Sequence, residues 1–324
     1  MMTYNQLDFS NVSVLVLGDV MLDAYIEGSV HRISPEAPVP IVSVTERTYT
    51  LGGAGNVALN LAELGCAVSL IGVRGVDEAG GLIKSFLRSR QIQDRMVIDS
   101  ECITTMKTRI IGNRQQQLLR FDEEQPRRAC SPSWNERLSI KDLVSSFNVV
   151  VLSDYAKGFL SQSFVQDVIV WAQTCNKPVL ADPPYKGDWE PYRNSTILTP
   201  NLLELYAEAR IESDVDHDLL YYAMESAASH YGVDWMVTTL GEDGVALYCC
   251  IDKTKEIMKS IAKEVYDVSG AGDTMIATLA ACVGAKIPVK DAVRISNVAA
   301  GIVVGKRGTQ PILIDELREA LCEN

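Results

Sequence analysis

Apolar segments alternate with amphipathic segments along most of this chain. Val12–Leu17 is a continuous apolar run that ends before a Gly-Asp pair, which is typical of a central parallel strand buried on both faces. Residues 53–65 and 78–90 have helical periodicity and flank a second buried strand, Ala67–Val73. This repeated order of strand and helix predicts a doubly wound, mostly parallel α/β sheet with helices on both faces, whose sites lie at the carboxyl ends of the strands.

The same alternation continues to the end of the chain. After a strand at Val149–Leu152, apolar side chains recur at helical spacing from Phe164 to Ala172. Further short strands are expected at Val179–Ala181, Thr196–Thr199 and Trp235–Thr239, and closing helices at 271–285, 289–304 and 314–322. Because no repeat or long linker divides the sequence, we expect residues 1–324 to form a single domain.

Two segments interrupt this alternation. Residues 24–48 and 104–121 lack helical periodicity and are rich in Thr, Val, Ile and Arg. We expect them to form a small β-sheet that stands over one end of the main sheet as a lid. Two such lids would cover each other's unpaired edges, so a homodimer through the lid is a further expectation.

Charge and composition narrow the possible partners. The net charge of −12 disfavours nucleic acids and anionic membranes. The N-terminal MMTYNQLDFS lacks the features of a signal peptide, and no apolar run reaches the roughly 18 residues of a membrane span, so we expect a soluble, cytoplasmic protein. The eight cysteines include no CxxC pair and the three histidines are scattered, which predicts neither a disulfide framework nor a zinc site.

The segment DVSGAGD, followed by the apolar run TMIATLAACVGA, predicts a strand end, a turn of small residues and the first turn of a buried helix. At Gly270, Ala271 and Gly272 the backbone N–H groups can approach an anion, and the helix N-terminus adds partial positive charge. Asp273 would repel a simple anion there, but it suits phosphoryl transfer, because a carboxylate can take the proton of an attacking hydroxyl. A glycine-rich loop with a capping Asp is the alternative.

Two motifs near the first strand suit a polyhydroxylated ligand. Asp19 and Asp23 of GDVMLD follow the strand, where their carboxylates can bind sugar hydroxyls or cap a turn. In LGGAGNVALNLAELG, Gly53 precedes a helix and Asn56 offers an amide. This stretch also matches the dinucleotide pattern G-x-G-x-x-A, but that fingerprint should follow the first strand directly. An NAD-dependent dehydrogenase is therefore a distant alternative.

Two later motifs suit a nucleotide and its metal. Asn201 and Glu204 of TPNLLEL lie three residues apart at a helix start, where they can hold a hydrated Mg²⁺ or form a capping box. TTLGEDG, residues 238–244, is a strand followed by a glycine-bracketed turn, which can be one wall of a nucleotide site or a hairpin.

Basic residues are concentrated in the second lid segment. A segment of fourteen residues in this otherwise acidic protein contains Lys107, Arg109, Arg114 and Arg120. On a strand, Lys107 and Arg109 share one face, as the binding of a sugar's phosphate would require. A solvated face with edge charges is the alternative.

Taken together, these motifs resemble the ribokinase-like, PfkB-type carbohydrate kinase family over nearly the whole chain. GGAGNVA, with Gly65 and Gly75, is similar to the family's N-terminal signature, and DVSGAGDTMIATLA to its C-terminal one, with Thr278 where a smaller residue is usual. GDVMLD, HRISPEAPVPIV, LSDYAKG and AAGIVVGKRGT further resemble the heptose 7-phosphate kinase branch.

The resemblance implies an activity. Members of that branch use ATP to phosphorylate the 1-hydroxyl of D-glycero-D-manno-heptose 7-phosphate, giving the 1,7-bisphosphate on the route to ADP-heptose and lipopolysaccharide. Some carry a nucleotidyltransferase domain behind the kinase, which we expect to be absent here. A kinase for another sugar, sugar phosphate or nucleoside is the nearest alternative. A non-catalytic sugar sensor is disfavoured, because a sensor needs no base such as Asp273.

The resemblance also implies a role for each motif residue. Asp273 matches the general base and Gly270, Ala271 and Gly272 the anion hole. The implied ATP and Mg²⁺ residues are Asn201, Glu204 (indirectly, for the metal), Thr239, Gly241, Gly244 and Asn297, and the implied substrate residues are Asp23, Gly53, Asn56, Lys107, Arg109, Arg120 and Lys186. Lys186 departs from the pattern, because Pro184 and Tyr185 intervene where the branch has Asp-Pro-Lys-Gly.

Overall fold

The computed structural model describes residues 7–113, 116–125, 132–185, 188–211, 217–262 and 265–323. Across these residues the main sheet has nine strands in the order β15-β14-β13-β12-β11-β10-β1-β4-β6. The strands from β13 to β6 run parallel, and β14 and β15 are antiparallel. Their bounds are β1 Ser13–Gly18, β4 Ala67–Ile71, β6 Gln93–Asp94, β10 Val149–Ser153, β11 Val179–Asp182, β12 Ile197–Leu198, β13 Trp235–Thr239, β14 Val245–Cys249 and β15 Lys255–Met258.

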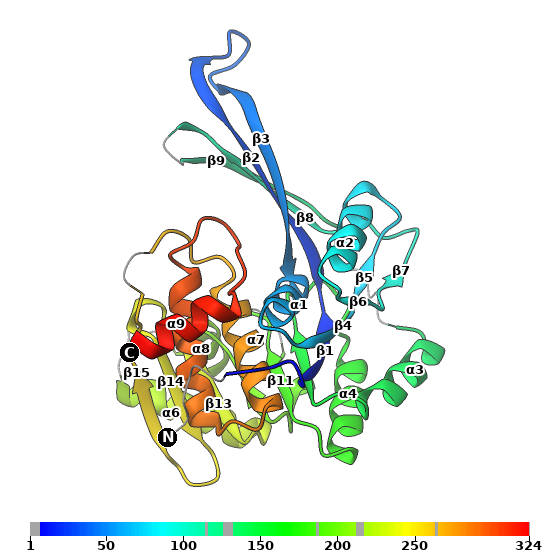
Figure 1. Cartoon of the computed structure of the whole chain (residues 1–324), viewed down its shortest axis with the longest axis vertical. Coiled ribbons are helices and arrows are strands. Elements are labelled where there is room, and N and C mark those ends of the chain that lie inside the picture. Colours follow the sequence, from blue (N-terminus) through cyan, green and yellow to red (C-terminus); the bar gives the residue numbers. More distant parts are fainter. Residues whose placement is uncertain are drawn as a thin grey trace.

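Helices cover both faces of this sheet (Figure 1), which confirms the doubly wound α/β prediction. They are α1 Ala54–Glu63, α2 Glu78–Ser89, α3 Trp134–Val144, α4 Gln162–Thr174, α5 Leu202–Ala209, α6 His217–Tyr231, α7 Ala271–Gly284, α8 Val289–Val303 and α9 Ile314–Glu323. No described helix combines the length and apolar character that crossing a bilayer requires.

Strand β1 shows why its apolar run is continuous. Val14 and Val16 pack into the core that α1, α2, α7, α8 and α9 share, whereas Leu15 and Leu17 pack into the core beneath α3, α4, α5 and α6. Successive side chains of a strand point to opposite faces, so a strand covered on both sides must be apolar at every position.

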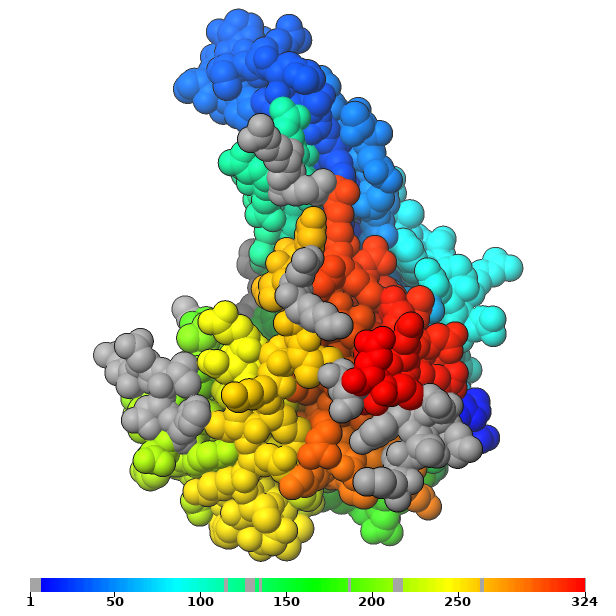
Figure 2. Space-filling model, turned by 60° about the vertical axis from the view of Figure 1, so that its left-hand side comes forward, coloured from blue at the N-terminus to red at the C-terminus, as the bar shows by residue number. Residues whose placement is uncertain are grey.

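The two segments without helical periodicity form a second sheet, in the order β3-β2-β8-β9. Its strands are β2 Val20–Ile33, β3 Pro40–Gly53, β8 Met106–Ile111 and β9 Gln117–Glu123, and we call them the lid sheet. They extend beyond the expected 24–48 and 104–121, since β2 begins two residues after β1 ends. Figure 2 shows the β2–β3 hairpin as a slender arm that projects from the body of the molecule.

One predicted strand is absent from the part of the chain described here. The residues before the DVSGAGD turn do not form a strand: β15 ends at Met258, and residues 265–270 are irregular. The N–H groups of Tyr266 and Asp267 donate to the Val304 carbonyl, and the Ser269 N–H donates to the Asp267 carboxylate. These bonds satisfy the backbone without a neighbouring strand, which the local sequence does not reveal.

Candidate active site

Asp273 lies in the first turn of α7, where the two glycine motifs of the sequence meet. Its side chain is buried, with 4% of the residue exposed. From the first turn of α1, the Asn56 Nδ2 atom donates a hydrogen bond of 2.8 Å to Asp273 Oδ2. The fold therefore joins residues that are 217 positions apart in the chain.

A residue with no role expected from the sequence bonds the other oxygen of this carboxylate. The Tyr155 hydroxyl donates to Asp273 Oδ1 at 2.7 Å. Tyr155 belongs to the LSDYAKG segment and comes two residues after β10 ends. Its place at the carboxyl end of a central strand is the signal that could have identified it.

The electrostatic surroundings of Asp273 are those of a base that works near neutral pH. Burial raises the pKa of Asp273 to about 6, and the hydrogen bonds from Asn56 and Tyr155 oppose that rise. Of the nearby charges, Asp23 raises this pKa and Lys107 lowers it. The ionised carboxylate is thus present at neutral pH and still basic enough to accept a proton.

The raised pKa of Asp273 predicts an acid limb in the pH dependence of activity. A base must be ionised to act, so kcat/KM should fall as the pH drops below about 6, where Asp273 becomes protonated. The measurement is initial-rate kinetics from about pH 4 to 8, with stability checked at each pH. A profile that stays flat down to the ordinary aspartate range near pH 4 would contradict this assignment.

The residues next to Asp273 have the geometry expected of an anion hole. Gly270 caps α7 with φ 81°, and Ala271 and Gly272 begin the helix. A Cβ atom at Gly270 would lie 2.7 Å from Asn56 Nδ2 and 2.9 Å from Thr309 Cγ2, so only glycine fits. The first N–H groups of a helix have no partner within the helix, so an anion can accept them; here the Ala271 N–H already donates to the Val268 carbonyl at 3.3 Å.

Two cavities, of about 580 and 790 Å³, lie on either side of the N-terminus of α7. Ala271, Gly272, Thr239 and Gly241 line both of them. The cavity near α8 is also lined by Gly244 and Asn297, whereas the other is lined by Asn201, Glu204 and Asp182. All six residues expected on the ATP side therefore line one or both of these cavities.

Asn201 and Glu204 form the capping box that the sequence left as an alternative. The Glu204 N–H donates to Asn201 Oδ1 at 2.9 Å, and the Asn201 N–H donates to Glu204 Oε2 at 2.7 Å. Glu204 nevertheless borders the cavity, as does Asp182. The pKa of Asp182 is raised well above its usual range by burial and then by Glu204 and Asp273. An excess of carboxylate oxygens suits a hydrated Mg²⁺. The described residues contain no cluster of three or more His, Cys, Asp or Glu side chains that could hold a metal ion.

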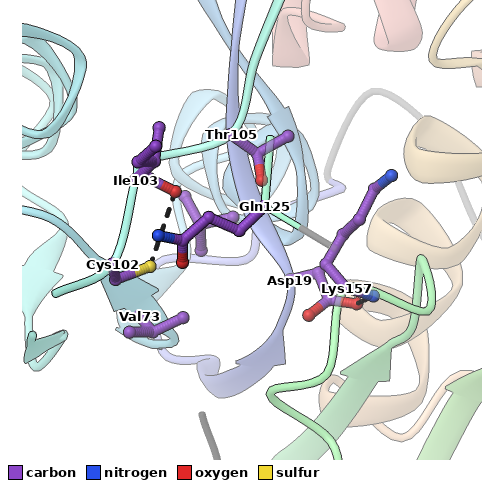
Figure 3. Close-up of a pocket in the computed structure, with 8 residues that line it drawn as sticks. Asp19, Val73, Cys102, Ile103, Thr105, Gln125 and Lys157 are labelled. Atoms are coloured by element: carbon purple, nitrogen blue, oxygen red, sulfur yellow. Dashed lines mark hydrogen bonds between the residues drawn. The ribbon is translucent and has the colours of Figure 1, made fainter. Parts of the chain in front are cut away.

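Asp19 forms the turn-capping bonds that the sequence offered as the alternative to binding a sugar hydroxyl. It is 2% exposed, and its carboxylate accepts the N–H groups of Tyr155, Lys157 and Phe159 at 3.0, 2.9 and 3.2 Å. Figure 3 shows Asp19 beside Lys157 in the wall of a small hollow below the lid sheet. The carboxylate thus holds the loop after β10.

Two of the basic lid residues that the sequence suggested for a phosphate form ion pairs with aspartates. Arg109 bonds Asp23 at 2.6 Å, and Arg120 bonds Asp122 at 2.6 Å. Lys107 forms no ion pair within the described residues; its Nζ atom lies 5.4 Å from the centre of the Tyr155 ring. Burial lowers the pKa of Lys107. Arg114 and Lys186 lie outside the described residues.

Residues 11–316, which are most of the chain, match the sequence pattern of the pfkB family of carbohydrate kinases. The chain belongs to the pfkB family. This pfkB protein is 44% identical over 307 residues to the D-beta-D-heptose 7-phosphate kinase of Bordetella bronchiseptica, covering 94% of each chain. It is 42% identical over 311 residues to the bifunctional protein HldE of Koribacter versatilis, which covers 95% of this chain and 63% of the relative. The chain thus spans just under two thirds of that relative's length.

Two solved kinase structures share the fold of this pfkB protein. The Escherichia coli phosphofructokinase-2 in complex with potassium superposes with a TM-score of 0.77 at 18% identity, over 96% of this chain and 98% of that one. The Arabidopsis thaliana ribokinase complexed with ribose and ATP gives 0.78 at 20% identity, with the same coverage. Likenesses at such low identity bear on the fold alone, and they confirm the ribokinase-like prediction.

Proposed function

We propose that this pfkB protein is an ATP- and Mg²⁺-dependent kinase that phosphorylates the 1-hydroxyl of D-glycero-D-manno-heptose 7-phosphate. The observation that carries the proposal is the Asp273 carboxylate, held by two donors at the N-terminus of α7 beside a cavity of nucleotide size. The similarity to the Bordetella kinase supports the choice of sugar. The alternatives are another sugar, sugar phosphate or nucleoside as acceptor.

In the proposed reaction, Asp273 takes the proton of the sugar hydroxyl, and the hydroxyl oxygen forms a bond to the γ-phosphorus of ATP. The bond from that phosphorus to the bridging oxygen breaks, and its electron pair leaves with ADP. The N–H groups at Gly270, Ala271 and Gly272 stabilise the negative charge on the phosphoryl group as it moves. Nothing else on the chain needs to react covalently, which agrees with a site built from one carboxylate and backbone amides.

We assign the nucleotide to the region lined by Thr239, Gly241, Gly244 and Asn297. The Asn297 side chain is fixed at the edge of this region by a hydrogen bond of 2.8 Å, which its Nδ2 atom donates to the Lys259 carbonyl. Asn201 and Glu204 would hold the water shell of Mg²⁺, beside Asp182. When bound, the ion neutralises phosphate charge and orients the terminal phosphate.

We assign the sugar to the space under the lid sheet, next to Asp273. Gly53 lies there with φ 58°, and a Cβ atom on it would come within 2.5 Å of the Asp19 carbonyl. Asn56 and Asp23 border this end, although both already bond protein groups, Asp273 and Arg109. Lys107 has no such carboxylate partner among the described residues, so we propose it as the principal ligand of the sugar's phosphate.

The proposed function is tested by an ADP-release assay across an acceptor panel, with and without Mg²⁺. The panel contains the heptose 7-phosphate, hexose phosphates, unphosphorylated sugars and nucleosides. We expect turnover to be fastest with the heptose 7-phosphate and to require Mg²⁺. Preference for another acceptor would support the alternative kinases, whereas binding of a sugar without any turnover would support a sensor.

We further propose that residues 1–324 act as one domain in the cytoplasm, where ATP is available, and that two copies pair through their lid sheets. The lid exposes large apolar side chains, among them Leu119 at 55% and Val44 at 48%. Leu119→Lys should shift the protein toward the monomer in light scattering after gel filtration. The matched control is Ile251→Lys, a change at an exposed apolar residue in the turn after β14. A monomeric parent protein, or equal effects of both changes, would exclude the lid dimer.

A further inference from the structure

The loop that carries Tyr155 is anchored by backbone hydrogen bonds to one carboxylate. It leaves the carboxyl end of β10, and three of its N–H groups, those of Tyr155, Lys157 and Phe159, donate to the single buried carboxylate of Asp19. Figure 3 shows Asp19 and Lys157 side by side at this place. Because Asp19 is anchored directly after β1, the backbone of Tyr155 is held against the centre of the main sheet.

From this loop the Tyr155 side chain reaches the proposed general base. Its hydroxyl donates to Asp273 Oδ1 at 2.7 Å, while Asn56 donates to Oδ2 at 2.8 Å. The last torsion of an aspartate side chain has a broad energy profile, so a carboxylate without such bonds can rotate. Two donors from different elements, one on each oxygen, fix the plane of the carboxylate.

We propose that Tyr155 is a positioning residue, which holds the Asp273 carboxylate so that a remaining lone pair faces the acceptor hydroxyl of the sugar. This inference rests on the proposed role of Asp273 as the base. Each carboxylate oxygen has two lone pairs, so a bond from Tyr155 leaves room for the substrate. The distance of 2.7 Å is that of a strong hydrogen bond to a charged acceptor.

Tyr155 is suited to donate and unsuited to compete for the substrate's proton. Burial, and then the Asp273 charge, raises the pKa of Tyr155 well above its ordinary value of 10.0. The phenol therefore keeps its proton throughout the working pH range and acts only as a donor. Since a donor stabilises the ionised carboxylate, its removal should raise the pKa of Asp273.

Other groups face Asp273 from every element packed around it. Asp23 on β2 disfavours its ionised form, whereas Lys107 on β8 and the Asn56 amide on α1 favour it. The Asp273 charge in turn raises the pKa of Asp182 at the end of β11. The Tyr155 hydroxyl is the donor from the loop after β10. None of the other groups changes in Tyr155→Phe, so a shift of the acid limb in that variant reports the lost hydroxyl.

The test is the pH dependence of kcat and kcat/KM for Tyr155→Phe, compared with Tyr192→Phe. Tyr192 is the control, because it is a buried tyrosine whose hydroxyl also donates to an aspartate, Asp154. In Tyr155→Phe the aromatic ring is retained, so its packing and its cation–π contact with the Lys107 ammonium should persist.

For Tyr155→Phe we expect kcat to fall roughly 10- to 100-fold, the fold-change that corresponds to losing a hydrogen bond to a charged group. KM for ATP should not change, and the acid limb should move to higher pH. Tyr192→Phe should leave the acid limb in place, even if it lowers the melting temperature. A second variant, with 3-fluorotyrosine at position 155, has a more acidic phenol and should move the limb to lower pH.

Two outcomes overturn the inference: an unshifted acid limb in Tyr155→Phe with the kcat of the parent protein, or the same shift in both tyrosine variants. Asp273→Asn separates this result from the proposed function. If Asp273→Asn is inactive and Tyr155→Phe behaves as the parent, only the positioning role fails. If Asp273→Asn keeps its activity, the assignment of the base itself fails.

Discussion

Asp273→Asn should lower kcat by roughly 10²- to 10⁴-fold, the usual contribution of a general base. The amide keeps the size of the carboxylate and can still accept a hydrogen bond from Asn56 or Tyr155, so the fold and ATP binding should persist. The measurement is steady-state kinetics with saturating sugar phosphate, together with calorimetric titration of ATP. This is the largest effect that we expect from a single substitution.

The chain offers a matched control for this experiment. Asp291 is the third residue of α8, just as Asp273 is the third residue of α7. The Asp291 side chain is 45% exposed and pairs with Arg294, and it lines neither of the two cavities. Asp291→Asn should therefore retain the parent kcat. Near-parental turnover of Asp273→Asn would remove this residue from its role and leave only the capping function that the sequence allows.

Lys107→Ala should raise KM for the sugar phosphate roughly 10- to 100-fold, because the variant loses a charge-assisted contact to the substrate's phosphate. KM for ATP should stay near its parental value, since ATP is assigned to the other side of the anion hole. Initial-rate kinetics with each substrate varied in turn provides the measurement. Lys84→Ala on the exposed face of α2 is the control for a general loss of positive charge.

An acceptor without the phosphate makes this prediction sharper. With an unphosphorylated sugar as acceptor, Lys107→Ala and the parent protein should have similar kinetic constants. Equal rises of KM for sugar phosphate and ATP would count against the lid assignment. So would a rise that persists with the unphosphorylated acceptor, because it would point to a structural role for Lys107 beside the Tyr155 ring.

Much of the fold follows from local patterns in the sequence. The apolar run that became β1 predicts a strand buried on both faces, and it lies between two cores as expected. The periodic segments became α1, α2, α7, α8 and α9 within a few residues of their expected bounds. The Asn201–Glu204 capping box could also be predicted from the sequence, because it joins residues only three positions apart.

The sequence by itself thus determined the layers of the fold and the segments that meet at the strand ends, because both depend on side-chain periodicity and on neighbours along the chain. Only the tertiary structure decided the partners of each charged side chain. It turned Asp19 toward the loop after β10, paired Arg109 with Asp23, and placed the Tyr155 hydroxyl on Asp273. Such contacts join residues separated by 86 to 136 positions, and no local pattern encodes which of many possible partners will lie within hydrogen-bond distance.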